Sequence, residues 1–231
     1  MIDGILLIDK ERDITSYDVI RKLKRILPKG QKIGHAGTLD PFATGLLIIL
    51  LGKGTKLMEE ILHYKKEYLV KVEFGYSTTT QDPTGEKTNE CKDSSPISIE
   101  NILKVINKKY IGEIEQTPPA FSAVKINGKK AYELARAGIE TKIKSRKVNI
   151  YVFQSIEYSW PFVSFLIQCS SGTYVRTLIN DLGEELKVFA TAVELRRNII
   201  GEYNVENAFK SEEITEENTD RILSNILTLN N

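Results

Sequence analysis

The sequence predicts an α+β fold built on a mixed, mostly antiparallel sheet flanked by helices and loops. The main reason is that strand and helix patterns are interleaved along the chain without the regular strand–helix–strand rhythm of a parallel sheet. The composition indicates a globular protein with a full core, because 41% hydrophobic and 27% charged residues in a chain of 231 are typical of that class. This length fits one large domain or two small ones.

The first third of the chain carries two strand patterns with a helix between them. Gly4–Asp9 reads GILLID and predicts a buried strand, and Thr15–Asp18 resembles a capping box at the start of a helix. Apolar residues then recur at helical spacing until Pro28 and Gly30 end the helix. The apolar run Leu46–Leu51 predicts a second buried strand.

The rest of the chain contains more strands than helices. Lys66–Phe74 alternates polar and apolar residues and predicts a half-buried strand, whereas the polar, proline-containing stretch Ser77–Ser95 predicts a long loop. Ser98 opens an amphipathic helix. The elements expected after it are a strand at Phe121–Ile126, a tight turn at Asn127-Gly128, a short helix at Ala131–Ala137, strands at Val148–Tyr158 and Phe162–Cys169, a helix at Tyr174–Leu186 and a strand at Val193–Ile200.

Positive charge is concentrated in two segments although the net charge is only +1. Residues 19–39 contain six basic residues and no acid, and residues 125–147 contain eight basic residues against two acids. Such local patches fit a polyanion. A solvated, lysine-rich helix face is the alternative for either segment alone.

Membrane, secreted and metal-binding classes are not expected. No window approaches the ~20 apolar residues of a membrane span, and the N-terminus lacks the features of a signal peptide. Two cysteines, two histidines and no CxxC pair give no metal-site spacing. We therefore expect a cytoplasmic protein with reduced thiols and no metal.

The segment Gly34–Leu47 reads GHAGTLDPFATGLL and places one acid, Asp40, among three glycines. Glycines permit close approaches that side chains would block, and Pro41 favours an extended Asp40. A carboxylate on such a loop beside a buried strand is suited to chemistry. An aspartate that only stabilises its own turn is the alternative, and residue types alone favour it slightly. His35 likewise fits either packing or function.

A second segment, Cys169–Arg176, places small residues after an apolar strand and then begins a helix with an aromatic residue and an arginine. A helix N-terminus disfavours a cation, so Arg176 there points to a specific partner such as a carboxylate or phosphate. A surface arginine is the equal alternative.

Four sequence blocks, in this order, carry a resemblance to a known family: GHAGTLDPFATGLL, KEYLV, QTPPAFSAVKINGKKAYELARAG and CSSGTYVRTLINDLGEEL. The chain resembles bacterial TruB-type tRNA pseudouridine-55 synthases from Gly4 to about Ile200. The resemblance implies the pseudouridine synthase catalytic fold and an isomerase that flips uridine 55 out of the T-loop of tRNA. It also implies that no metal or organic cofactor is used.

The resemblance also implies the catalytic residues. Asp40 matches the essential carboxylate, which attacks the base or the sugar or assists a glycal-like intermediate. Arg176 matches the arginine that pairs with that acid. Tyr68 matches a tyrosine that stacks on the base and is a candidate to remove the C5 proton, although its strand position also fits plain core packing.

Residues matching the family's substrate contacts form a second set. His35 helps to hold the opened loop, Gly37 belongs to an RNA-contacting face, and Tyr174 and Leu195 line the pocket. A basic insertion at about 113–147 closes over the RNA and supplies phosphate contacts. The basic residues assigned to these contacts are Lys125, Lys129, Lys130 and Arg146.

The expected organisation is a catalytic domain over residues 1–210 and an acidic tail or helix over 211–231, without the RNA-binding PUA domain of many members. We expect a monomer that binds the tRNA T-arm and no membrane. Lys10–Ser16 lacks the family's usual proline and glycine, and Thr191 stands where many members carry histidine.

Overall fold

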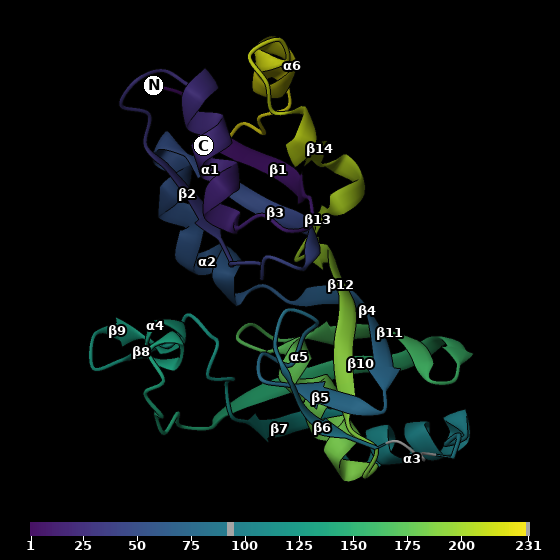
Figure 1. Cartoon of the computed structure of the whole chain (residues 1–231). Helices are drawn as coiled ribbons and strands as arrows, with labels where there is room; N and C mark the ends of the chain where they lie inside the picture. Colours follow the sequence, from purple (N-terminus) through teal and green to yellow (C-terminus); the bar gives the residue numbers. More distant parts are fainter. Residues whose placement is uncertain (92–94, 230–231) are drawn as a thin grey trace. The chain divides into compact units, whose positions relative to one another are not determined.

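The computed structural model describes residues 1–91 and 95–229, which form two compact units. Unit 1 comprises Met1–Tyr68 and Leu195–Asn231, and unit 2 comprises Leu69–Glu194. The chain passes from one unit to the other within strands β4 (Lys66–Phe74) and β12 (Ala190–Ile200), as Figure 1 shows. Each unit contains a mostly antiparallel sheet with helices, so the predicted α+β class is confirmed.

In unit 1 the strands follow the order β14-β1-β3-β12, with β2 also on β3 and β13 on β12. Strand β3 is central, because β1 pairs antiparallel with it from Gly4↔Leu51 to Lys10↔Gly45 and β12 pairs parallel at Arg197↔Gly45. The elements of unit 1 beside β4 and β12 are β1 (Gly4–Lys10), α1 (Ser16–Ile26), β2 (Ile33–Ala36), β3 (Thr44–Leu51), η1 (Gly52–Leu57), α2 (Met58–His63), β13 (Tyr203–Asn204), η2 (Val205–Asn207), β14 (Phe209–Lys210), η3 (Ser211–Glu213) and α6 (Thr219–Ser224).

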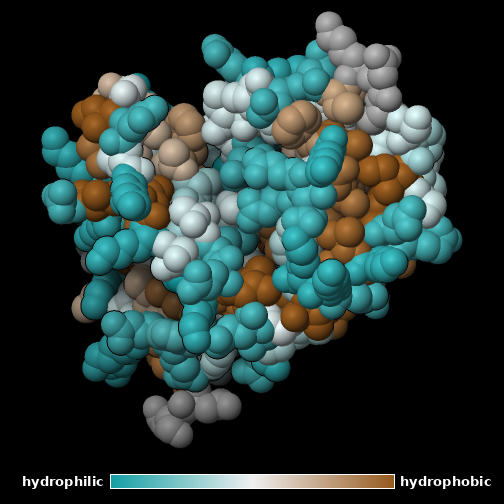
Figure 2. Space-filling model, turned by 90° about the horizontal axis from the view of Figure 1, so that it is seen from below, coloured by the Kyte–Doolittle hydropathy of each residue, from teal (hydrophilic) through white to brown (hydrophobic). Residues whose placement is uncertain are grey.

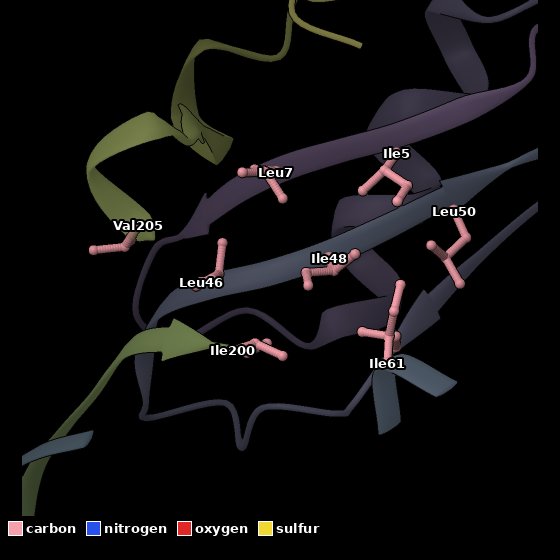
Figure 3. Packing of buried hydrophobic residues seen from close by; sticks show 9 residues of the cluster. Ile5, Leu7, Leu46, Ile48, Leu50, Ile61, Ile200 and Val205 are labelled. Carbon is pink, nitrogen blue, oxygen red and sulfur yellow. The ribbon is translucent and has the colours of Figure 1, made fainter. Parts of the chain in front are cut away.

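The core of unit 1 explains the apolar run of β3. Every residue of β3 after Thr44 is buried, as expected for a central strand covered on both faces. Alternate residues Leu46, Ile48 and Leu50 pack with Ile5 and Leu7 of β1, and residues from β2, α2, β12 and η2 complete the cluster (Figure 3). This buried strand gives the preceding loop a rigid support.

In unit 2 the strand order is β12-β4-β11-β10-β7. Strand β10 pairs antiparallel with β11 and with β7, and the second ladder begins at Arg146↔Gln116. The further elements of unit 2 are β5 (Tyr76–Thr78), β6 (Lys87–Glu90), α3 (Ile99–Lys109), β7 (Gly112–Gln116), β8 (Lys125–Ile126), β9 (Lys129–Lys130), α4 (Ala131–Arg136), β10 (Arg146–Ser159), β11 (Phe162–Cys169) and α5 (Val175–Glu185). On the face that Figure 2 shows, hydrophilic residues alternate with patches of hydrophobic residues.

Local sequence signals placed several element ends correctly. Thr15 caps α1 in the expected capping box, and Ser98 caps α3. The Asn127-Gly128 turn joins β8 and β9 with positive φ at both residues. Strands β1, β3, β4, β10, β11 and β12 and helices α4 and α5 lie where the sequence predicts them.

Two sequence predictions were wrong. Phe121–Ile126 is a strand only at its last two residues, because the carbonyls of Ser122 and Val124 accept bonds from the start of α4 instead of a strand partner. Ser77–Ser95 is not a single loop, because β5 and β6 pair as a hairpin within it. Strand β6 is exposed throughout and polar, which hides it from hydrophobic patterning, and residues 92–94 of the predicted loop lie outside the described residues.

The acidic C-terminal segment folds onto unit 1 over its described part. Helix α6 lies near the helix expected at Asp220–Leu227, and Leu227 exchanges two backbone hydrogen bonds with Ile5, of 3.0 and 2.8 Å. The two cysteines, Cys91 and Cys169, are both free thiols. Strands β2 and β7 and helix α2 were not predicted, since they are short and weakly patterned.

A substitution of Gly45 tests how closely β12 packs on β3. Its φ is +102°, and an added Cβ would lie 2.3 Å from the backbone oxygen of Arg197. Gly30 has φ +83° with nothing within 4 Å of such a Cβ, so Gly30→Ala is the matched control. We expect Gly30→Ala to lower the free energy of unfolding by about 1–2 kcal/mol and Gly45→Ala by about 3–5 kcal/mol in urea titrations. Equal losses would contradict this packing.

Candidate active site

The loop that carries Asp40 connects β2 to β3 in unit 1. Leu39, Phe42 and Ala43 are buried on it, and Asp40 is half-buried. The Ser16 hydroxyl accepts from the Leu39 amide at 2.9 Å and also bonds to the Leu39 carbonyl at 3.2 Å. The Ala43 amide donates to the Asp40 carbonyl at 3.1 Å. The backbone on both sides of the carboxylate is therefore fixed.

Arg197 of β12 holds the two ends of this loop. Its guanidinium is buried and donates through Nε to the Leu46 carbonyl at 2.8 Å and through Nη2 to the Gly37 carbonyl at 2.9 Å. One planar fork thus joins the residues before and after Asp40. Gly37 has φ +85°, which turns the chain at the start of the loop.

Lys10 holds the middle of the loop. Its side chain is fully buried, and Nζ donates to the carbonyls of Glu11 at 2.7 Å, Ile14 at 2.9 Å and Pro41 at 3.2 Å. Burial lowers the pKa of Lys10 to about 8, and the negative charge of Asp40 acts against this lowering. Lys10 and Arg197 together form a pair of buried cations beside the Asp40 loop.

His35 lies on β2 opposite Ile49 of β3. Burial, and secondarily the charge of Arg197, lowers the pKa of His35, so its imidazole is neutral at physiological pH. Among the described residues its buried Nδ1 has no hydrogen-bond partner. A neutral ring at this position can stack on a base or exchange hydrogen bonds, but it does not supply a charge for a phosphate.

Tyr68 and Leu195 both lie on strands that continue into unit 2. Tyr68 is on the buried face of β4 and Leu195 is buried on β12, and their role in lining a pocket stays a prediction. Plain core packing of Tyr68 remains equally compatible with this position.

Arg176 lies in the first turn of α5 in unit 2 and is buried. Nη1 lies 3.4 Å from Asp82 Oδ2 and also donates to the Thr80 carbonyl, and Nη2 donates to the Phe121 carbonyl at 3.1 Å. The expectation of a carboxylate partner is confirmed in Asp82, and the alternative of a surface arginine is wrong.

Asp82, the buried carboxylate that contacts Arg176, was not predicted from the sequence. Its Oδ1 accepts from the Thr80 hydroxyl at 2.7 Å and from the Thr84 amide and hydroxyl at 2.9 and 2.5 Å. These contacts close the turn of the β5–β6 hairpin and leave Oδ2 for Arg176. The Thr-x-Asp-x-Thr spacing was the available signal, since it is typical of a self-bonded turn.

Tyr174 is the N-cap residue of α5 and is held by two residues of the predicted insertion. Gln116 bonds to both its backbone groups, and the Arg146 guanidinium lies 5.1 Å from the ring centroid. Arg146 also donates to the Gly172 carbonyl. Arg146 therefore has contacts inside the protein as well as the phosphate role that the resemblance implies.

The predicted phosphate-binding lysines lie on the β8–β9 hairpin. Lys125, Lys129 and Lys130 are all exposed, and Lys130 Nζ lies 5.5 Å from the centroid of the Tyr132 ring.

Thr191 is buried and donates to the Tyr76 carbonyl at 3.0 Å. In the described ranges, no set of three or more His, Cys, Asp or Glu side chains could hold a metal, and no helix is long and apolar enough to cross a membrane.

The structure thus brings the candidate residues together in two groups. Asp40, His35 and Gly37 share unit 1 with the buried cations Lys10 and Arg197, and Arg176, Tyr174 and Arg146 share unit 2. The expected pairing of Asp40 with Arg176 joins residues of different units and stays a prediction.

Comparison with known proteins gives a consistent result. Residues 24–175 match the model of the TruB family pseudouridylate synthase N-terminal domain. The chain is 43% identical over 217 residues to tRNA pseudouridine synthase B of Clostridium tetani, covering 94% of this chain and 74% of that protein. It is 43% identical over 228 residues to tRNA pseudouridine synthase B of Endomicrobium trichonymphae, covering 99% and 97%.

Among solved structures, a chain of a Cbf5–Nop10–Gar1 complex has a TM-score of 0.67 and 28% identity, covering 90% of this chain and 52% of that chain. This chain therefore spans about half of that structural neighbour. A chain of an archaeal box H/ACA sRNP Nop10–Cbf5 complex, with a TM-score of 0.68 at 24% identity, shares the fold.

Lys10, which is buried against the Asp40 loop, makes the stability of the protein depend on pH. Its pKa is about 8 in the folded state against 10.5 for an ordinary lysine, so below pH 8 both folded and unfolded chains are protonated there and the folded state carries the cost of the buried charge. Between pH 8 and 10.5 only the unfolded chain keeps the proton, so the free energy of unfolding increases as the pH rises. Lys10→Met has no group that titrates in this range, so this increase in stability is absent from the variant.

The measurement is urea unfolding of the wild type and of Lys10→Met at several pH values from 7 to 10. We expect the stability of the wild type to increase relative to Lys10→Met as pH rises through this window. A constant difference, or one that shrinks with pH, would contradict a buried lysine of lowered pKa.

Proposed function

Because the chain belongs to the TruB family of pseudouridylate synthases, we propose that it is a tRNA pseudouridine synthase that isomerises uridine 55 of the T-loop. The observation that carries this proposal is the 43% identity to a tRNA pseudouridine synthase B over 99% of this chain and 97% of that relative. The geometry supports it, because the family's essential carboxylate falls on a loop that Arg197 and Lys10 hold at both ends and in the middle.

The reaction rearranges bonds within one nucleotide and needs no second substrate. The bond from N1 to C1′ breaks, the base turns, a bond from C5 to C1′ forms, C5 loses its proton and N1 gains one. We assign the reacting carboxylate to Asp40. A fixed carboxylate suits this chemistry, since a nucleophile must stay within contact of the sugar or base while the base turns.

Arg176 is proposed as the charge partner of Asp40. Support comes from its burial and from its rigid mounting, because Asp82, the Thr80 carbonyl and the Phe121 carbonyl fix the guanidinium. A fixed guanidinium favours the ionised form of a nearby carboxylate and supplies directed hydrogen bonds. Tyr68 and Leu195 are proposed to line the pocket, with Tyr68 against the base.

The uridine must leave the stack of the T-loop before it reaches Asp40, at a cost of a few kcal/mol. We propose that His35 and Gly37 contact the opened loop, which the neutral imidazole can do without attracting phosphates. The exposed Lys125, Lys129 and Lys130 are proposed to bind the RNA backbone. We further propose that the protein acts as a monomer in the cytoplasm, where its tRNA substrate is found.

The test is to incubate the protein with an unmodified tRNA transcript and to map pseudouridines by chemical labelling and reverse transcription. We expect one new pseudouridine, at position 55, and none in a matched transcript with cytidine at that position. Binding of tRNA without any conversion would instead indicate an RNA-binding factor, and conversion at another uridine would overturn the assigned target.

A further inference from the structure

Gln116, the last residue of β7, uses its whole side-chain amide to hold one residue of another element. Its Oε1 accepts from the Tyr174 amide at 2.8 Å, and its Nε2 donates to the Tyr174 carbonyl at 3.0 Å. Gln116 is only 2% exposed, so these bonds are shielded from water. Tyr174 is the N-cap of α5 and lies two residues before Arg176. The position of Tyr174 therefore sets the position of the Arg176 backbone.

Arg146 contacts the same segment from the neighbouring strand. It is the direct partner of Gln116 in the β7–β10 ladder. Its guanidinium donates to the Gly172 carbonyl and lies 5.1 Å from the Tyr174 ring centroid. Gln116 therefore holds the backbone of Tyr174 while Arg146 covers its ring.

A third contact reaches Arg176 itself. The Phe121 carbonyl, five residues after Gln116, accepts from Arg176 Nη2 at 3.1 Å. The segment from Gln116 to Arg146 thus meets the start of α5 at its backbone, at its aromatic ring and at its arginine. The start of α5 needs such support, because Tyr174 provides no side-chain cap of its own.

We propose that Gln116 and Arg146 form a clamp that positions Tyr174 and Arg176 for pseudouridine formation. Both are positioning residues, since they act through Tyr174 and the start of α5. The clamp rests on the proposed function, and it links the segment assigned to RNA binding directly to the arginine assigned to the reaction. Displacing a catalytic group by about 1 Å can cost on the order of 100-fold in rate, so losing the clamp slows the reaction.

The chain offers a matched control in unit 1. Gln31 is also buried and makes the same pair of bonds to Ile2, accepting from its amide at 2.8 Å and donating to its carbonyl at 2.7 Å. Gln31 makes one further bond, to the Lys32 carbonyl at 3.1 Å. Replacing either glutamine by the similarly shaped methionine removes a backbone clasp, but only Gln116 clasps the start of α5.

The experiment measures three quantities for wild type, Gln116→Met and Gln31→Met: the single-turnover rate of pseudouridine formation at saturating tRNA, the Kd for tRNA, and the midpoint of thermal unfolding. We expect both variants to lower the midpoint, by about 4–8 °C. Only Gln116→Met should lower the rate, by about 10- to 100-fold, with Kd within about threefold of wild type. Equal rates for the two variants would overturn the clamp.

Gln116→Glu provides a readout that general destabilisation does not give. An ionised carboxylate there faces the Tyr174 carbonyl with an acceptor, whereas a protonated one restores the donor and the acceptor of the amide. Burial raises the pKa of such a carboxyl group above its ordinary value of about 4.3, and the positive charge of Arg146, its partner in the ladder, acts against this rise. We expect the rate of Gln116→Glu to recover toward wild type as pH falls from 8 to about 5.5, while Gln116→Met stays slow. A constant ratio to wild type would contradict the clamp even if Gln116→Met does not fold.

Arg146→Lys separates the clamp from phosphate binding. It keeps the positive charge but loses the planar group that covers Tyr174 and reaches Gly172. We expect a lower single-turnover rate with an unchanged Kd for tRNA. An increased Kd with an unchanged rate would mean that Arg146 only binds RNA and does not position Tyr174. If the wild type forms no pseudouridine, the proposed function fails and the clamp falls with it. If the wild type is active and Gln116→Met is equally active, the clamp is wrong and the proposed function stands.

Discussion

A single buried arginine, Arg197, holds the loop that carries Asp40, and the geometry of unit 1 depends on it. Its hydrogen bonds to the Gly37 and Leu46 carbonyls join the two ends of the loop, and the chain approaches so closely here that Gly45 has no room for a side chain. A buried charge is costly unless its donors are satisfied, and the two carbonyls offset this cost for Arg197. The charge of Arg197 also helps to lower the pKa values of His35 and Lys10.

Unit 2 fixes its own charged group by a different route. Arg176 is held by a buried carboxylate and by two carbonyls, and the residues that supply them come from the β5–β6 hairpin and from the segment after β7. The turn of the hairpin is polar, and the hydrogen bonds of Asp82 to Thr80 and Thr84 fix its shape. The arginine at the start of α5 is thus held by polar contacts with a hairpin turn and with the segment after β7.

The sequence predicted the parts of this arrangement that depend on local pattern. The capping box at Thr15, the buried strand after the Asp40 loop and an unusual arginine at the start of α5 are each visible within about ten residues. Gln116 and the pairing of Asp82 with Arg176 were missed because the partners are distant in the sequence; Gln116 and Tyr174 are 58 positions apart. A polar residue in a loop reveals its partner only when the fold is known, and patterning cannot show that an arginine such as Arg197 faces a loop carbonyl.

The proposed function requires Asp40 to be the reacting carboxylate of a tRNA pseudouridine synthase. The most direct measurement compares tRNA binding with single-turnover pseudouridine formation for Asp40→Asn, which keeps the shape of the side chain and removes its charge. Asp13→Asn is the control, because Asp13 is exposed and its amide bonds to the Pro41 carbonyl of the same loop at 2.8 Å. We predict that Asp40→Asn binds tRNA within about threefold of wild type and loses at least about 10⁴-fold in rate, with Asp13→Asn near wild type. An Asp40→Asn rate within tenfold of wild type would contradict it.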